Sequence, residues 1–151
     1  MQIEFTVPGA CVPQSRPRAR KAGNRIKMYD PKESREYKDY VSLIAKQYAP
    51  KKPLEGELSV TIKVYRQIPK STPKKLKELY KAKIKRPIVK PDNSNYAKPI
   101  EDALNKIIYN DDSQIVDLHV HKYYSDNPRV EVTIKDLSLI TASYQIGEGQ
   151  M

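Results

Sequence analysis

Carboxylates gather in two short segments of an otherwise strongly basic chain. The first segment, KPDNSNYAK, places Asp92 six residues before Lys98, and the second, NDDSQ, carries Asp111 and Asp112. Aspartates hold divalent cations, which can polarise a phosphate oxygen and lower the pKa of a bound water. Residues of these types could therefore hydrolyse a phosphodiester, with Lys98 stabilising the negative charge that develops.

Each acidic segment also has an ordinary structural interpretation. Asp92 stands among Asn and Ser residues, which often satisfy the free N–H groups at a helix start, and NDDS is typical of a turn. The surrounding charge favours the functional interpretation. Six bases and no acid lie between residues 12 and 28, and ten bases and one acid between 66 and 90. Between residues 92 and 136 the balance reverses, with nine acids against five bases.

The composition limits the class of protein. A formal net charge of +10 on 151 residues favours a polyanionic partner, with a merely soluble basic protein as the alternative. The single Cys11 excludes an internal disulfide and a cysteine-based zinc site, and it fits a reducing compartment. No apolar run approaches the roughly 20 residues of a membrane span, and the N-terminus lacks a signal pattern. We expect a cytoplasmic protein of one domain.

The elements that must position these residues follow from apolar periodicity. Alternating apolar residues predict strands over residues 2–9 and 56–68 and a C-terminal antiparallel hairpin made of 113–125 and 128–137. Apolar residues at steps of three and four predict helices near 32–48, 73–86 and 95–107. Their order predicts an α+β fold in which one mixed β-sheet is packed by two or three helices. The folded domain would span residues 1–137, followed by a loosely ordered tail over 138–151.

Three local expectations accompany this outline. Residues 12–31 hold three prolines and many arginines without a period, which predicts an extended loop or arm. Ser71 or Thr72 should cap the second helix, with Pro73 at its first position. Pro99 should fall in the first turn of the third helix, or kink it there, because proline lacks an N–H.

The third helix would separate the two acidic segments. A helix over residues 95–107 is about 18–20 Å long, so its two ends cannot both contact one ion. Asp92 and Asp112 can meet at one site only if the chain doubles back and the following strand runs beside the helix start.

The central segment resembles the signature of a known nuclease family. The run KPDNSNYAKPIEDALNKIIYNDDSQI is similar to the motif of the RusA family of Holliday junction resolvases, and the resemblance with its flanking elements covers about 135 residues. The matching positions are Lys90, Pro91, Asp92, Asn95, Lys98, Asp102, Ala103, Leu104, Asn105, Asp111, Asp112 and Gln114. The arm VPQSRPRAR resembles the family's basic N-terminal element at Pro13, Arg16, Pro17 and Arg18.

The resemblance implies a homodimeric endonuclease of bacterial or phage origin that cuts four-way DNA junctions symmetrically in recombination and repair. It implies Mg²⁺ as the cofactor, with Mn²⁺ as a possible substitute, and neither an organic cofactor nor a membrane partner. Asp92 and Asp112 would hold the metal with Asp111 in reserve, and Lys98 would stabilise charge or position the water. The residues expected to bind DNA are Arg16, Arg18, Arg20, Lys21, Lys74, Lys75 and Lys90.

One departure from the family pattern leaves alternatives open. Ser94 stands where the family usually has a second aspartate, and fewer carboxylates should weaken Mg²⁺ binding. The chain could be an enzyme that needs high metal or is compensated by Asp111 or Asp102. It could also be a junction-binding protein of the same fold with weak or lost cleavage, or a basic RNA- or ribosome-associated module. The run DLHVH could chelate a transition metal, although it is more typical of the wetter face of a half-buried strand.

Overall fold

A four-stranded sheet, covered on one face by two helices, forms the centre of the computed structural model, which describes residues 1–138 and 144. In spatial order its strands are β1 (Gln2–Pro8), β6 (Arg129–Asp136), β4 (Leu58–Gln67) and β5 (Ile115–Ser125). β4 and β5 are parallel and the other neighbours antiparallel, so the predicted mixed sheet and α+β fold are confirmed. The helices are α1 (Lys32–Lys46), α2 (Lys74–Lys81) and α3 (Asn93–Leu104).

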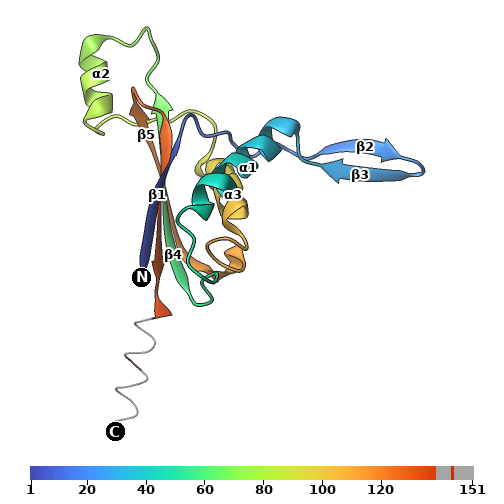
Figure 1. Cartoon of the computed structure of the whole chain (residues 1–151). Helices are drawn as coiled ribbons and strands as arrows, with labels where there is room; N and C mark the ends of the chain where they lie inside the picture. The colour runs from blue at the N-terminus through green and yellow to red at the C-terminus, as the bar shows by residue number, and fades with distance from the viewer. Residues whose placement is uncertain (139–143, 145–151) are drawn as a thin grey trace.

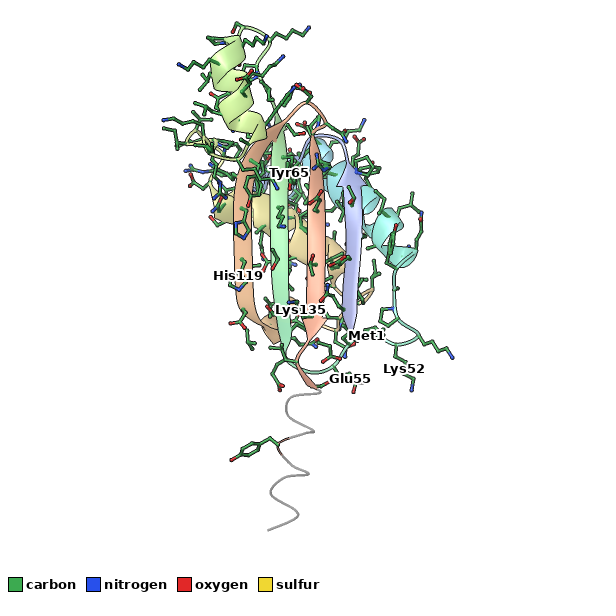
Figure 2. All side chains as sticks on the ribbon, turned by 90° about the vertical axis from the view of Figure 1, so that its left-hand side faces the viewer. Met1, Lys52, Glu55, Tyr65, His119 and Lys135 are labelled. Atoms are coloured by element: carbon green, nitrogen blue, oxygen red, sulfur yellow. The ribbon has the colours of Figure 1, made fainter. Side chains whose placement is uncertain are left out.

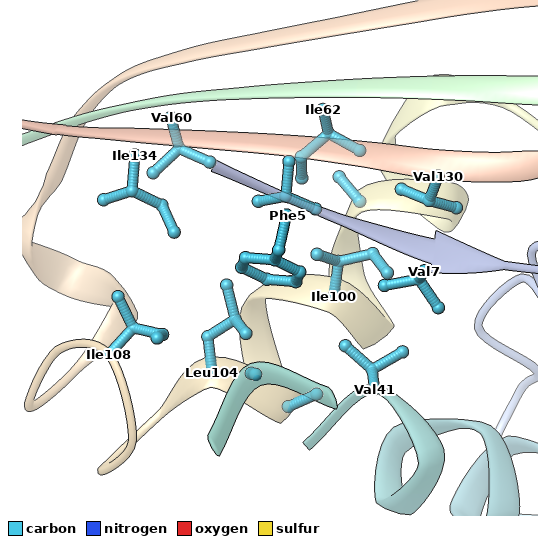
Figure 3. Close-up of a cluster of buried hydrophobic side chains, with 14 of the residues drawn as sticks. Phe5, Val7, Val41, Val60, Ile62, Ile100, Leu104, Ile108, Val130 and Ile134 are labelled. Atoms are coloured by element: carbon cyan, nitrogen blue, oxygen red, sulfur yellow. The ribbon is translucent and has the colours of Figure 1, made fainter. Parts of the chain in front are cut away.

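The hydrophobic core lies between the sheet and the pair α1 and α3. Buried residues alternate with exposed ones in β1, where Phe5 and Val7 are buried and Thr6 between them is exposed. They meet buried side chains of the helices, including Val41 of α1 and Ile100 and Leu104 of α3 (Figure 3). These contacts fix the orientation of α3, the helix that follows Asp92.

The opposite face of the sheet is polar. Figure 2 shows this face, where Tyr65, His119 and Lys135 project from three different strands. Within residues 1–138 and 144, no three His, Cys, Asp or Glu side chains form a group that could hold a metal ion. In the run DLHVH, Asp117 and His119 are exposed and His121 is half-buried, and binding of a transition metal there stays a prediction.

The two C-terminal strands, β5 and β6, are consecutive, antiparallel and joined by a short turn, as predicted. They are not hydrogen-bonded to each other, because β4 lies between them and pairs with both. The sequence pattern could not indicate this insertion, since periodicity gives the face of a strand and not its neighbours.

The expected loop over residues 12–31 is wrong in part, because it contains a β-hairpin. Strands β2 (Arg18–Ala22) and β3 (Arg25–Tyr29) pair antiparallel and project as a ribbon from the end of α1 (Figure 1). All ten residues of the two strands are exposed, so the apolar alternation that normally marks a strand is missing. In α2, Pro73 occupies the N-cap position rather than the first helical position, and neither Ser71 nor Thr72 takes that place.

The expected place of Pro99 is also wrong, because α3 begins at Asn93 and continues through the proline. In a helix, the N–H of residue 99 would bond to the carbonyl of Asn95, and proline cannot supply it. That carbonyl instead accepts the backbone N–H of Gln14 at 2.8 Å. The arm thus satisfies the group that Pro99 leaves free and ties itself to α3.

Two further expectations concern the C-terminal tail and a membrane-spanning helix. The predicted tail falls largely on residues 139–143 and 145–151, which lie outside the described residues. Over the described part of the chain, no helix combines the length and apolar character needed to cross a membrane.

Candidate active site

Lys98, at the end of the first acidic segment, contacts Asp112 of the second. Asp112 opens the 3₁₀ turn η1 (Asp112–Gln114), and its Oδ2 lies 3.9 Å from Lys98 Nζ. The same Nζ lies 3.2 Å from Oδ1 of Asp102, one helical turn further along α3. Side chains four residues apart share one face of a helix, so α3 presents Lys98 and Asp102 together toward η1.

The loop that carries Asp112 is fixed by Gln114. The side-chain oxygen of Gln114 accepts the backbone N–H groups of Asn110 and Asp111, both at 2.9 Å. Its side-chain nitrogen donates to the carbonyls of Leu54 and Gly56 at 2.8 and 3.0 Å. Four hydrogen bonds from one side chain therefore hold the start of η1 against the segment before β4. This explains the glutamine of the motif as a structural residue.

Asp111 caps this turn. Its Oδ2 accepts the backbone N–H of Ser113 at 3.0 Å, and with Gln114 it forms a capping box. Hydrogen bonds from Ser113, foremost from its side chain, lower the pKa of Asp111. The turn interpretation is confirmed for Asp111, whereas the carboxylate of Asp112 is directed toward Lys98. The reserve role of Asp111 as a metal ligand stays a prediction.

Glu101 adds a carboxylate that was not among the predicted site residues. It is half-buried, and burial, followed by the negative charge of Asp112, raises its pKa. The sequence did contain an indication of this role, because Glu101 lies three residues after Lys98 and so on the same face of the helix. The hydrogen bond with Asp102 and the charge of Asp102 raise the pKa of Lys98 above its ordinary range.

Asp102 is shared between two lysines. Its second oxygen lies 3.3 Å from Nζ of Lys38 in α1, which also binds Asp30 at 2.9 Å. Lys38 lowers the pKa of Asp30 through this hydrogen bond. A line of alternating charges therefore runs from Asp30, directly after β3, through Asp102 to Lys98. Asp102 holds the position of Lys98 and already has two cationic partners.

Asp92 occupies the N-cap position of α3 and is exposed. Its side chain makes no capping hydrogen bond with any described residue, so the capping interpretation is wrong for this carboxylate. Next to it, Asn93 Nδ2 donates to the carbonyl of Val120 at 3.3 Å, so β5 runs beside the helix start as the doubling-back of the chain required. Ser94 is exposed in the first turn of α3.

The carboxylate oxygens in this region are the type of ligand that a hard cation such as Mg²⁺ prefers. Mg²⁺ is usually held by one or two carboxylates together with waters and substrate phosphates, so a cage of three acids is not needed. Burial raises the pKa of Glu101, and the negative charge of Asp112 adds to this effect, which a cation bound nearby would offset. Asp92 and Asp112 as its ligands stay a prediction.

The predicted DNA-binding residues lie at the surface. Lys74 and Lys75 are exposed on α2, and Lys90 is exposed before α3, where its carbonyl accepts Nη1 of Arg66 at 2.8 Å. The arm residues lie on or just before the ribbon, and all are exposed: Arg16, Arg18, Arg20 and Lys21. Their role in binding DNA stays a prediction.

Comparison with known proteins gives two matches. The family model described as Endodeoxyribonuclease RusA matches residues 8–135. The chain is also 48% identical over 138 residues to a Bacillus subtilis (strain 168) protein described as "Uncharacterized protein YqaN". That alignment covers 90% of this chain and 97% of the relative. Both the ribbon and the segments that carry Lys98 and Asp112 lie within the family match.

Proposed function

We propose, because the chain belongs to the RusA endodeoxyribonuclease family, that it resolves four-way DNA junctions by metal-dependent hydrolysis of phosphodiesters. The observation that carries the proposal is the placement of Lys98 Nζ between Asp102 and Asp112, at 3.2 and 3.9 Å. This placement puts Lys98, the last residue of the first acidic segment, against Asp112 of the second, and it leaves a cation that can face a phosphate.

Each residue of the site has a distinct role in this proposal. Lys98 binds the scissile phosphate and stabilises the charge that develops on its oxygens. Asp102 orients Lys98 through their ion pair. Asp92 and Asp112 would hold Mg²⁺, which supplies polarisation of a phosphate oxygen and a lower pKa for an attacking water. Glu101, half-buried beside Asp112, adds to the negative field that attracts the cation.

Symmetric cleavage requires two such sites. A four-way junction presents two related scissile phosphates, and a homodimer with a two-fold axis presents two related sites to them. We therefore include a homodimer in the proposal.

A junction-binding protein without efficient cleavage is the second candidate. Ser94, exposed in the first turn of α3, favours it, because a carboxylate at this position, four residues before Lys98, would share the helix face of that lysine. A serine hydroxyl adds no negative charge for a divalent cation. The two candidates share the fold and the basic surface and differ only in catalysis.

Incubation of an end-labelled four-way junction with the protein in Mg²⁺ or Mn²⁺ distinguishes them. The nuclease is expected to cut two opposing strands at related positions and to leave a linear duplex of the same sequence intact. Tight binding without nicks in either metal would favour the second candidate. Failure to prefer the junction over the duplex, in binding and in cleavage, would contradict both.

A further inference from the structure

The ribbon of β2 and β3 has two chemically different faces. Residues opposite each other in an antiparallel pair point to the same side, and successive residues of a strand point to opposite sides. The pairing Arg20↔Lys27, with Arg18↔Tyr29 and Ala22↔Arg25, therefore defines one face. The pairs that define the other face are Ala19↔Met28 and Lys21↔Ile26.

The first face, which we call the basic face, concentrates the charge. It carries Arg18, Arg20, Arg25 and Lys27, together with Tyr29 and Ala22. The Arg20 guanidinium lies 5.7 Å from the centre of the Tyr29 ring, which agrees with their common side. The other face has Lys21 as its single cation, among Ala19, Ile26 and Met28. The arm cations that the sequence grouped together are thus divided, with Lys21 separated from Arg18 and Arg20.

We propose that the basic face of the ribbon lies in the major groove of a duplex arm of the DNA substrate. This inference rests on the proposed function, because it takes branched DNA as the ligand. It specifies which side of the ribbon meets the DNA. It adds Arg25 and Lys27 to the expected DNA contacts and replaces the expectation that Lys21, on the other face, contacts the DNA.

The charge arrangement is unfavourable without an anion. Like charges directly opposite each other in a strand pair are destabilising, and Arg20 faces Lys27 in this way. An isolated two-stranded ribbon is also marginal in water, and this one projects away from the body of the molecule (Figure 1). The phosphates of a duplex relieve the repulsion of the four cations. A major groove about 12 Å wide admits a two-stranded ribbon.

The ribbon is short and turns tightly, as insertion into a groove requires. Two residues, Gly23 and Asn24, connect the paired residues Ala22 and Arg25. Gly23 has a φ of +66°, and glycine at the first central position is typical of a type II′ hairpin turn. No bulky loop therefore widens the tip.

Both ends of the ribbon are fixed to the helix that carries the candidate active site. On the entering side, the backbone N–H of Gln14 donates to the Asn95 carbonyl of α3 at 2.8 Å. On the leaving side, Asp30 binds Lys38, which in turn binds Asp102 of α3. A duplex held by the ribbon is therefore held relative to Lys98 as well, so the ribbon helps to place the junction at the site.

Two neighbouring cations on opposite faces provide the test. Arg20→Gln and Lys21→Gln remove one charge each from adjacent positions of the same strand, and thermal unfolding confirms that both variants fold. Junction affinity is measured in EDTA, where cleavage cannot interfere, across a series of KCl concentrations. The plot of log affinity against log salt concentration has a negative slope, and each lost phosphate contact makes it less steep by about 0.9. This corresponds to an affinity about 8-fold weaker at 0.1 M salt.

Arg20→Gln should show this loss of slope and affinity, whereas Lys21→Gln should lose less than about 2-fold. Wild-type protein should also protect guanine N7 in one duplex arm from dimethyl sulfate, and Arg20→Gln/Lys27→Gln should not. Equal losses in the two single variants, no loss in either, or unprotected N7 would overturn the proposal. Because the readouts are binding and protection, a chain that binds but does not cut would contradict the proposed nuclease and leave this test intact.

Discussion

Replacing Lys98 by Met separates a catalytic role of this lysine from a structural one. Its ion pairs with Asp102 and Asp112 have lengths of 3.2 and 3.9 Å, and its side chain is 54% exposed. Exposed ion pairs of this kind contribute about 0.3–0.5 kcal/mol each, so the free energy of unfolding should fall by no more than about 1 kcal/mol for the two pairs together. For a chain of this size, that corresponds to about 2–4 °C in Tm. A lost charge stabiliser in the transition state, by contrast, costs about 10²–10³ in rate.

The assay is single-turnover cleavage of a four-way junction at saturating protein, with Tm measured by circular dichroism. Lys32→Met is the matched control, because Lys32 also pairs with a carboxylate four residues on, Glu36, at 3.7 Å on an exposed helix surface. It should match wild type in both readouts. A Lys98→Met variant that cuts within a few-fold of wild type would refute the assigned role, as would a rate loss that follows only a large fall in Tm.

Three further predictions concern the same region. Ser94→Asp should lower the Mg²⁺ concentration for half-maximal cleavage by about 10-fold or more. An unchanged Mg²⁺ requirement would contradict the idea that Ser94 weakens metal binding. Because the pKa of Glu101 is raised, the folded state keeps a proton that the unfolded state loses above about pH 4.3, so stability falls as pH rises through that window. Glu101→Gln should therefore raise Tm at pH 7, and the gain should vanish below about pH 4; an equal gain at both pH values would contradict this. Gln114→Ala should lower stability by about 2 kcal/mol, seen as about 4–8 °C in Tm, because it removes four hydrogen bonds. A Tm within 1 °C or so of wild type would contradict that role.

Local patterns in the sequence predicted the main elements of the fold but not their partners. Alternation and helical spacing indicated β1, β4, α1 and the two C-terminal strands. All of these except β5 bury one apolar face, whereas Val116 and Leu118 of β5 are exposed. The ribbon escaped prediction because its alternation is between a charged and a mixed face, neither of which enters the core. The place of β4 between β5 and β6 depends on contacts between distant residues, which periodicity does not encode.

The position of Pro99 illustrates the same limit. Because proline lacks an N–H, Pro99 was predicted to lie in the first turn of α3, and this rule is valid for an isolated helix. In the folded chain the backbone N–H of Gln14, from a segment about 80 residues earlier, bonds to the Asn95 carbonyl instead. A tertiary contact therefore overrides a sound local rule.

The candidate site was predictable in its residue types and less so in its arrangement. The motif indicated Lys98 and Asp112, and the structure places them 3.9 Å apart. It could not separate Asp111 from Asp112, because two adjacent aspartates look alike until one of them accepts a capping hydrogen bond. The contribution of Glu101 depends on burial and on a charge from another segment, which spacing alone does not determine.

Variants of Asp111 and Asp112 provide the most direct test that the candidate active site at Lys98 and Asp112 cuts DNA. Single-turnover junction cleavage in Mg²⁺ is compared for Asp111→Asn and Asp112→Asn. Asp111→Asn should retain most of the cleavage, because asparagine keeps an oxygen that can accept the Ser113 N–H. Asp112→Asn should lose about 10²-fold or more while its junction affinity in EDTA matches wild type. Equal losses in the two variants, or full cleavage by Asp112→Asn, would contradict the account.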